Sequence, residues 1–296
     1  PAIAAGRSLA RRGGDAVVSH VAVVGAGTMG NGIAHVFAQH GWDTLLVDVS
    51  REALERARQT IAGNLDRQVK KGGLTTEQKD ATLGRVSTAT ALDGTGQAEL
   101  VIEAATEHPD TKFAIFRDID AAAPARAILA TNTSSISITA IAANTKRPSQ
   151  VIGMHFMNPV PVMPLVEVIR GLETSDQTAA RTIEIAQALG KTPVAVNDAP
   201  GFVSNRVLMP MINEAVFCVH EGVATPEAVD TVMKLGMSHP LGPLALADLI
   251  GLDVCLAILE VLQRDLGEDK YRPCPLLRKM VAAGRLGRKS GRGFYD

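Results

Sequence analysis

The order of apolar and polar positions from His20 onwards predicts alternating strands and helices. An apolar run at 21–24 is typical of a buried strand, and apolar residues at helical spacing over 29–39 follow it until Gly41. The same patterns predict further strands at 44–49, 100–103 and 128–130, and helices at 51–71 and 111–122. Alternating units of this kind predict a parallel, doubly wound sheet with right-handed crossovers.

The pattern changes along the second half of the chain. Two extended runs at 151–156 and 162–169 are joined by a segment with Pro159 and Pro161, which excludes a helix there. A helix over 176–189 and a strand near 193–196 follow. Beyond Pro200 all apolar spacing is helical, and it predicts helices at 203–221, 226–234, 244–264 and 275–283. We therefore expect a domain boundary near Pro200.

Composition and charge exclude several functional classes. The chain of 296 residues has a formal net charge of −1, so no bulk field attracts nucleic acid or an anionic membrane. No apolar stretch approaches the ~18 residues of a membrane helix. Cys218, Cys255 and Cys274 are odd in number and widely spaced, which argues against a disulfide framework and a zinc site. We expect no metal, and reduced thiols in a cytoplasmic protein.

The first residues differ from the rest. Arg7, Arg11 and Arg12 stand against the single acid Asp15 among several glycines. This composition predicts a disordered tail over 1–17, and the remnant of an organelle transit peptide is the alternative.

A glycine-rich motif follows the first predicted strand and opens the first helix. It fits G-x-G-x-x-G and consists of Gly25, Ala26, Gly27, Thr28, Met29 and Gly30. The first glycine permits the tight turn, the second lets the backbone approach a pyrophosphate, and the third lets helix and strand pack closely. The helix N-terminus attracts the phosphate charge. In this context the motif predicts a dinucleotide site.

Asp48 ends the second predicted strand, near the ~20-residue offset of a carboxylate that holds the adenosine ribose. Its charge would repel a 2′-phosphate, so we expect NAD as the cofactor, although Arg51 lies close enough to weaken this preference. The fold class is therefore α/β. We expect a doubly wound Rossmann-type dinucleotide-binding domain over 18–199, followed by a smaller all-helical C-terminal domain over 200–296.

A second site decides the reaction. Period-2 alternation places Glu167 on one face with Leu165 and Ile169. A carboxylate on an apolar face needs a partner, and His155 in the preceding run can supply it across the short Pro-rich turn. In an alcohol oxidation His155 would take the hydroxyl proton while Glu167 fixes the tautomer. A buried structural His–Glu pair is an equally supported alternative at this stage.

Asn132, Thr133, Ser134 and Ser135 follow the strand at 128–130. Ligands of doubly wound sheets bind beyond the carboxyl ends of strands, where hydroxyl groups can contact a substrate oxygen. Ser and Asn are also ordinary loop and helix-capping residues, so a purely structural role for this segment is an open alternative.

Eight segments resemble one enzyme family when they are taken together and in this order. They are GAGTMGNG at 25–32, VIEAA at 101–105, NTSS at 132–135, GMHFMNPV at 153–160, LVEVI at 165–169, PGFVSNR at 200–206, HPLGP at 239–243 and LGRKSGRGFY at 286–295. From about residue 20 to the C-terminus, the chain resembles the (S)-3-hydroxyacyl-CoA dehydrogenases. Its nearest resemblance is to bacterial members that act on 3-hydroxybutyryl-CoA.

The resemblance implies a role for each matching residue. His155 is the catalytic base and Glu167 its partner, while Ser134 and Asn205 contact the reacting oxygen. The residues placed in the cofactor site, in addition to the glycine-rich motif and Asp48, are Glu107, Lys112, Ser134, Asn158 and Lys289. Those placed on the CoA substrate are Asn64, Lys71 and Ser134. Without the resemblance, Lys71 would be read as a solvated helix end. The helical domain is implied to form a homodimer.

We therefore expect reversible, NAD-dependent oxidation of (S)-3-hydroxyacyl-CoA to 3-ketoacyl-CoA in fatty acid β-oxidation or butanoate metabolism. A gulonate-type sugar-acid dehydrogenase and a non-catalytic NAD-binding module are the alternatives. Two positions depart from the family pattern: Met157 replaces a usual Phe, and Ser204 replaces a usual apolar residue. These departures leave the acyl-chain length open.

Overall fold

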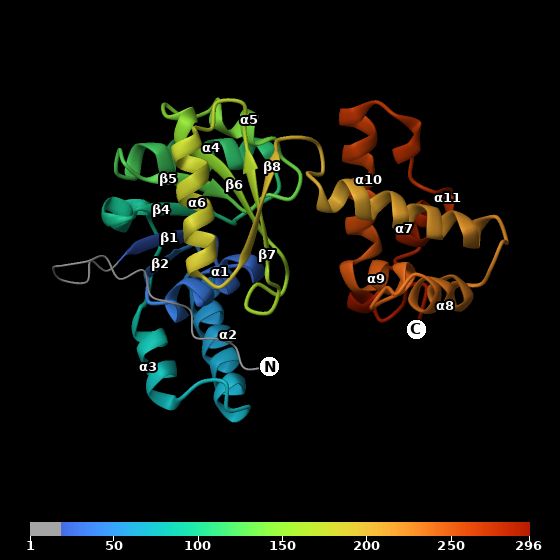
Figure 1. The fold of residues 1–296 in the computed structure, drawn as a ribbon, viewed down its shortest axis with the longest axis horizontal. Coiled ribbons are helices and arrows are strands. Elements are labelled where there is room, and N and C mark those ends of the chain that lie inside the picture. The colour runs from blue at the N-terminus through green and yellow to red at the C-terminus, as the bar shows by residue number, and fades with distance from the viewer. Residues whose placement is uncertain (1–18) are drawn as a thin grey trace. The chain divides into compact units, whose positions relative to one another are not determined.

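The computed structural model describes residues 19–296, so the tail predicted over 1–17 lies outside the described residues. The chain divides between Asp198 and Ala199 into two compact units (Figure 1). None of the helices formed by the described residues is long and apolar enough to cross a lipid bilayer.

The first unit is built on one sheet. Within the described residues its eight strands stand in the order β3-β2-β1-β4-β5-β6-β7-β8. They are β1 (His20–Val24), β2 (Asp43–Val47), β3 (Val86–Ala89), β4 (Leu100–Glu103), β5 (Ile128–Thr131), β6 (Val151–Phe156), β7 (Leu165–Arg170) and β8 (Thr192–Asn197). The doubly wound α/β fold is confirmed, and all strand pairs but one are parallel. The pairing of β6 with β7 is antiparallel, because the short connection between them reverses the chain.

Helices α1 (Thr28–Gln39), α2 (Arg51–Lys70) and α6 (Asp176–Ala188) share one apolar core with one face of this sheet. Ile33, Phe37 and Leu65 are among its fully buried side chains. The other helices of the unit are α3 (Thr76–Gly84), α4 (Pro109–Ala122) and α5 (Ile138–Ala142), with short 3-10 turns η1 (Leu92–Gln97) and η2 (Pro148–Gln150). The sequence patterns did not predict α3, η1, β3 or α5, which are short, polar or at the sheet edge.

The second unit has a helical core of its own, which includes Ile212, Leu244 and Leu259. Its helices are α7 (Ser204–His220), α8 (Pro226–Gly236), α9 (Pro243–Ile250), α10 (Leu252–Leu266) and α11 (Pro275–Ala282), with η3 (Asp269–Tyr271) and η4 (Arg288–Ser290). The single helix predicted over 244–264 was wrong. Gly251 has a φ of 107°, which no helix contains, and it separates α9 from α10.

His35 is a buried histidine of α1 that faces α2. The Gln68 amide lies 3.3 Å from its Nε2, and Nδ1 has no hydrogen-bond partner in the described part of the chain. The pKa of His35 is lowered from 6.5 to about 4, chiefly by burial, and the nearby charges of His40 and Lys191 act in the same direction. Between pH 6.5 and about 4 this imidazole is therefore neutral in the native protein and protonated in the unfolded chain.

We expect this histidine to make stability depend on pH. Between pH 6.5 and about 4 the unfolded state binds the proton and the native state does not, so the free energy of unfolding falls as pH is lowered through this window. Between pH 7 and pH 4.5 the loss attributable to His35 should be about 2 kcal/mol. Urea unfolding of the wild type and His35→Gln at pH 7 and pH 4.5 measures it. Equal pH dependence in both proteins would contradict the expectation.

Candidate active site

The glycine-rich turn connects β1 to α1 and is shaped by close backbone contacts. Gly25 has a φ of 105°, and a Cβ there would lie 2.6 Å from the Cα of Ala105. A Cβ on Gly30 would lie 1.7 Å from the carbonyl oxygen of Gly25. At Gly27, by contrast, a Cβ would meet no heavy atom within 4 Å. The turn is thus closed toward the protein and open where a ligand would approach.

The N-terminus of α1 is suited to an anion. Gly27 is its N-cap and supplies no side-chain bond, and the first turn carries no acidic residue. Gly27 and Thr28 are exposed and Met29 is half-buried. The helix dipole and the first N–H groups are therefore available to phosphate oxygens. These features fit the pyrophosphate of a dinucleotide.

Asp48 lies directly after β2 and beside this turn. Its carboxylate accepts hydrogen bonds from the amide of Ala26 at 2.8 Å and from the amide of Ser50 at 2.9 Å. Two backbone donors hold the carboxylate in place, so it can present a fixed acceptor to a ribose. The structure thus brings the predicted cofactor residues around Gly27 together with Asp48.

His155 and Glu167 form the pair that the alternation predicted. They are register partners in the antiparallel pairing of β6 with β7. The distance from His155 Nδ1 to Glu167 Oε2 is 2.8 Å, and the two side chains are 10% and 3% exposed. This contact makes Nδ1 the nitrogen oriented by the carboxylate. Proton chemistry at the ring therefore falls to Nε2.

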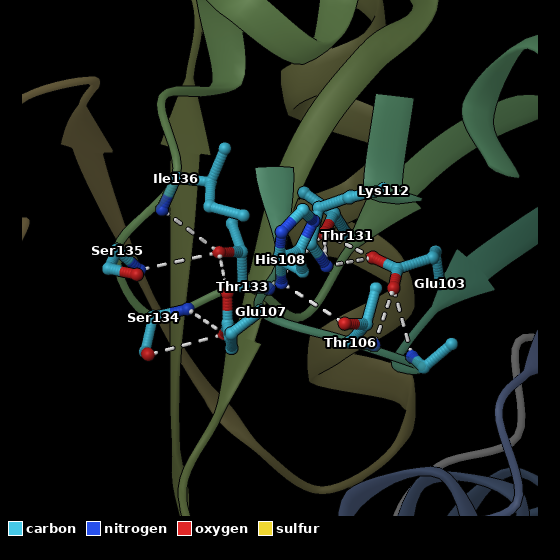
Figure 2. A network of polar contacts seen from close by, with 11 residues as sticks. Glu103, Thr106, Glu107, His108, Lys112, Thr131, Thr133, Ser134, Ser135 and Ile136 are labelled. Carbon is cyan, nitrogen blue, oxygen red and sulfur yellow. Dashed lines mark hydrogen bonds and ion pairs between the residues drawn. The ribbon is translucent and has the colours of Figure 1, made fainter. Parts of the chain in front are cut away.

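Ser134 lies in the loop that follows β5, at the carboxyl edge of the parallel strands. Glu107, from the loop after β4, accepts hydrogen bonds from the Ser134 amide at 2.8 Å and the Ser134 hydroxyl at 3.3 Å (Figure 2). Asn132 accepts a hydrogen bond from the amide of Phe156 at 2.9 Å. Because Phe156 follows His155, Asn132 ties the Ser134 loop to the strand that carries the histidine.

Lys112 is almost fully buried at 1% exposure, and its ammonium forms an ion pair with Glu103. Glu103 lies within the segment VIEAA, but no pattern in the sequence assigns it a role. The sequence feature that could have indicated its importance is a carboxylate at the end of an otherwise apolar strand. Every residue of that strand, β4, is buried. The sequence likewise assigns no individual role to Asn132.

The remaining predicted residues lie in the loop after β6, on α2 and at its end, and in the second unit. Asn158 is exposed in the loop after β6. Asn64 is half-buried on α2 and bonded to Arg67, and Lys71 is exposed at the end of that helix. In the second unit Asn205 lies in the first turn of α7, and Lys289 bonds Asp253 at 2.7 Å. Their roles stay predictions.

Both parts of the chain match the domains of one known enzyme family. Residues 20–199 match the NAD binding domain of 3-hydroxyacyl-CoA dehydrogenase, and residues 201–296 match the C-terminal domain of the same enzyme. The chain belongs to the 3-hydroxyacyl-CoA dehydrogenase family. The predicted family, enzyme class and NAD cofactor are thereby confirmed for this dehydrogenase.

Individual relatives cover nearly the whole dehydrogenase. A probable 3-hydroxybutyryl-CoA dehydrogenase of Bacillus subtilis is 56% identical over 279 residues, which are 94% of this chain and 97% of the relative. The 3-hydroxybutyryl-CoA dehydrogenase of Bradyrhizobium diazoefficiens is 53% identical over 95% and 96% of the two chains. A crystal structure of (S)-3-hydroxybutyryl-CoA dehydrogenase from Ralstonia eutropha matches with a TM-score of 0.92 at 52% identity, over 94% and 98%.

Proposed function

We propose that this dehydrogenase oxidises short (S)-3-hydroxyacyl-CoA thioesters, (S)-3-hydroxybutyryl-CoA foremost, reversibly to the 3-ketoacyl-CoA with NAD. The observation that supports this reaction most directly is the buried His155–Glu167 pair at the carboxyl edge of a NAD-binding sheet. His155 Nδ1 lies 2.8 Å from Glu167 Oε2. The names and the 53% and 56% identities of the two relatives support the four-carbon substrate. Fatty acid β-oxidation or butanoate metabolism is the matching context.

In the proposed reaction NAD, when bound, supplies the acceptor for the hydride. His155 Nε2 takes the proton of the 3-hydroxyl group, and Glu167 stabilises the imidazolium that forms. Ser134 and Asn205 contact the reacting oxygen and fix its position. In the reverse direction the imidazolium returns the proton to the oxygen, so one pair serves both directions.

The binding roles are also proposed. The glycine-rich turn and Asp48 hold the adenosine and pyrophosphate parts of NAD, with Glu107, Lys112, Ser134, Asn158 and Lys289 in the same site. Asn64 and Lys71 contact CoA, with Ser134 near its thioester. Asn64 on α2 and its C-cap residue Lys71 are seven positions apart, about two helical turns, so they lie on the same side of the C-terminal end of the helix. Lys71 supplies a positive charge for a CoA phosphate.

The substrate assignment is tested by following NADH, which is consumed when a 3-ketoacyl-CoA is reduced and formed when gulonate is oxidised. Acetoacetyl-CoA and longer 3-ketoacyl-CoA esters are compared at equal concentrations, and gulonate with NAD is the control for a sugar-acid dehydrogenase. We expect the highest kcat/KM with acetoacetyl-CoA. Turnover of gulonate without turnover of any acyl-CoA would refute the proposal.

A preference for NAD(H) over NADP(H) should follow from Asp48. A 2′-phosphate would meet a carboxylate that two backbone amides hold in place at 2.8 and 2.9 Å. We expect kcat/KM to favour NADH by more than about tenfold, equivalent to ~1.4 kcal/mol. The measurement compares both cofactors with acetoacetyl-CoA, and Asp48→Asn should narrow the ratio. A wild-type preference for NADPH would show instead that Arg51 binds the phosphate.

We further propose a homodimer formed through the second unit and a cytoplasmic location. The second unit exposes large apolar side chains, among them Val223, Val232, Leu235 and Met237. Surface of this kind is commonly buried in an interface. Sedimentation at micromolar concentration tests the dimer.

The three free cysteines support the proposed cytoplasmic location, because thiols stay reduced in that compartment.

A further inference from the structure

A buried charged network joins the two loops that follow β4 and β5. Glu103 at the end of β4 is fully buried, and it pairs with Lys112 of α4, which is 1% exposed. Across the sheet, Glu103 is the register partner of Thr131 at the end of β5. Figure 2 shows these side chains pointing toward one another.

The Glu103 carboxylate makes contacts in two directions. Its Oε1 accepts hydrogen bonds from the amides of Ala105 at 2.9 Å and Thr106 at 3.3 Å. Its Oε2 accepts from the ammonium of Lys112 and from the hydroxyl of Thr131, the latter at 2.8 Å. One carboxylate thus fixes the loop after β4, the first turn of α4 and the end of β5.

The contacts continue from Thr131 to Ser134. The Thr131 hydroxyl accepts a hydrogen bond from the Thr133 amide at 3.2 Å. The Thr133 hydroxyl donates to Glu107 Oε2 at 2.7 Å, and Glu107 Oε1 accepts from the Ser134 amide at 2.8 Å (Figure 2). Glu107 itself follows the loop that Glu103 anchors, so the two routes from Glu103 meet at Ser134.

Stability alone does not account for this network. A buried ion pair costs much desolvation, and well-packed apolar residues often replace such a pair without loss of stability. A fully satisfied buried network does restrict its loops to one geometry. Here the loops lie at the carboxyl edge of the sheet, where the ligands of such folds bind.

We propose that Glu103 is a positioning residue for the reaction, and that Thr131 relays its effect to Ser134. The network sets the place of the Ser134 hydroxyl and so the alignment of the substrate's 3-oxygen. This inference rests on the role of Ser134 in the proposed function. Neither Glu103 nor Thr131 contacts the substrate in this mechanism.

Thr131 provides the test, because valine and serine separate its shape from its hydroxyl. Thr131→Val keeps the shape and removes the relay, and we expect kcat with acetoacetyl-CoA to fall about 10- to 100-fold, the scale of a small misplacement of a reacting group. Thr131→Ser keeps the hydroxyl and should retain wild-type kcat. Thr182→Val is the matched control: Thr182 is fully buried on α6, and its hydroxyl bonds the Thr178 carbonyl oxygen at 2.8 Å. Its kcat should be unchanged.

A double-variant cycle distinguishes positioning from general damage. If Thr131 acts through Ser134, Thr131→Val should lower kcat much less in a Ser134→Ala background than in the wild type. Glu103→Gln should likewise lower kcat much less in the Ser134→Ala background than in the wild type. If Glu103→Gln does not fold, the comparison of Thr131→Val in the two backgrounds still decides the question. Equal factors in both backgrounds, or an unchanged kcat in Thr131→Val, would overturn the inference.

Amide hydrogen exchange supplies a readout that does not depend on turnover. Exchange over residues 132–136 should accelerate in Thr131→Val and remain at the wild-type rate in Thr131→Ser and Thr182→Val. Unchanged exchange in Thr131→Val would also overturn the inference. A wild type without activity on any 3-ketoacyl-CoA would refute the proposed function instead, while the exchange result would still decide whether the network orders the Ser134 loop.

Discussion

Replacement of His155 by glutamine should lower kcat by about two to four decades, the usual contribution of general acid–base catalysis. The glutamine amide can donate a hydrogen bond to the Glu167 carboxylate but cannot take up the substrate's proton. NADH binding should stay nearly unchanged, because His155 lies on β6 while the cofactor turn lies between β1 and α1. Single-turnover hydride transfer and NADH fluorescence titration measure the two quantities on the same samples.

The control for this variant is a matched exchange at another buried histidine. His35→Gln removes an imidazole from α1 outside the site and should leave hydride transfer unchanged at neutral pH. If the His155–Glu167 pair were only structural, its disruption would destabilise the fold by about 3–5 kcal/mol, and the loss of activity would follow the loss of folded protein. Melting temperatures separate these cases. A folded His155→Gln protein with near-normal hydride transfer would mean that another group is the base.

The sequence predicts those parts of the site that short-range patterns determine. The glycine-rich turn is one continuous segment between an apolar strand and a helix, so its context is visible in the sequence. The His155–Glu167 pairing follows from alternation on two runs joined by a short turn, which limits the possible registers. A carboxylate on an apolar face then required a partner, and only one residue of the facing run could supply it.

The Glu103 network could not be predicted in the same way. Glu103 and Thr131 are brought together by a parallel register between strands that α4 separates, and no local pattern determines that register. Lys112 would be expected at a solvated helix surface, because lysine is rarely buried without a partner. Gly251 illustrates a related limit. Apolar spacing continues from α9 into α10, and only the backbone conformation reveals the break.

Glu167→Gln should lower kcat by about 10- to 1,000-fold, because the imidazolium formed in the reaction loses its counter-charge. Glutamine preserves the shape of the side chain, so KM and NADH binding should change little. Circular dichroism and melting temperature establish that the variant is folded at the assay temperature. A folded variant with wild-type kcat would show that the carboxylate does not support the base.

The double variant His155→Gln/Glu167→Gln completes the argument, because the carboxylate is proposed to act only through the imidazole. Once His155 is absent, removal of the negative charge has no imidazolium left to destabilise. The kcat of the double variant should therefore be close to that of His155→Gln alone and far above the product of the two single losses. Single-turnover hydride transfer of all four proteins gives the coupling free energy. Losses that multiply would mean that Glu167 contributes to the reaction independently of His155.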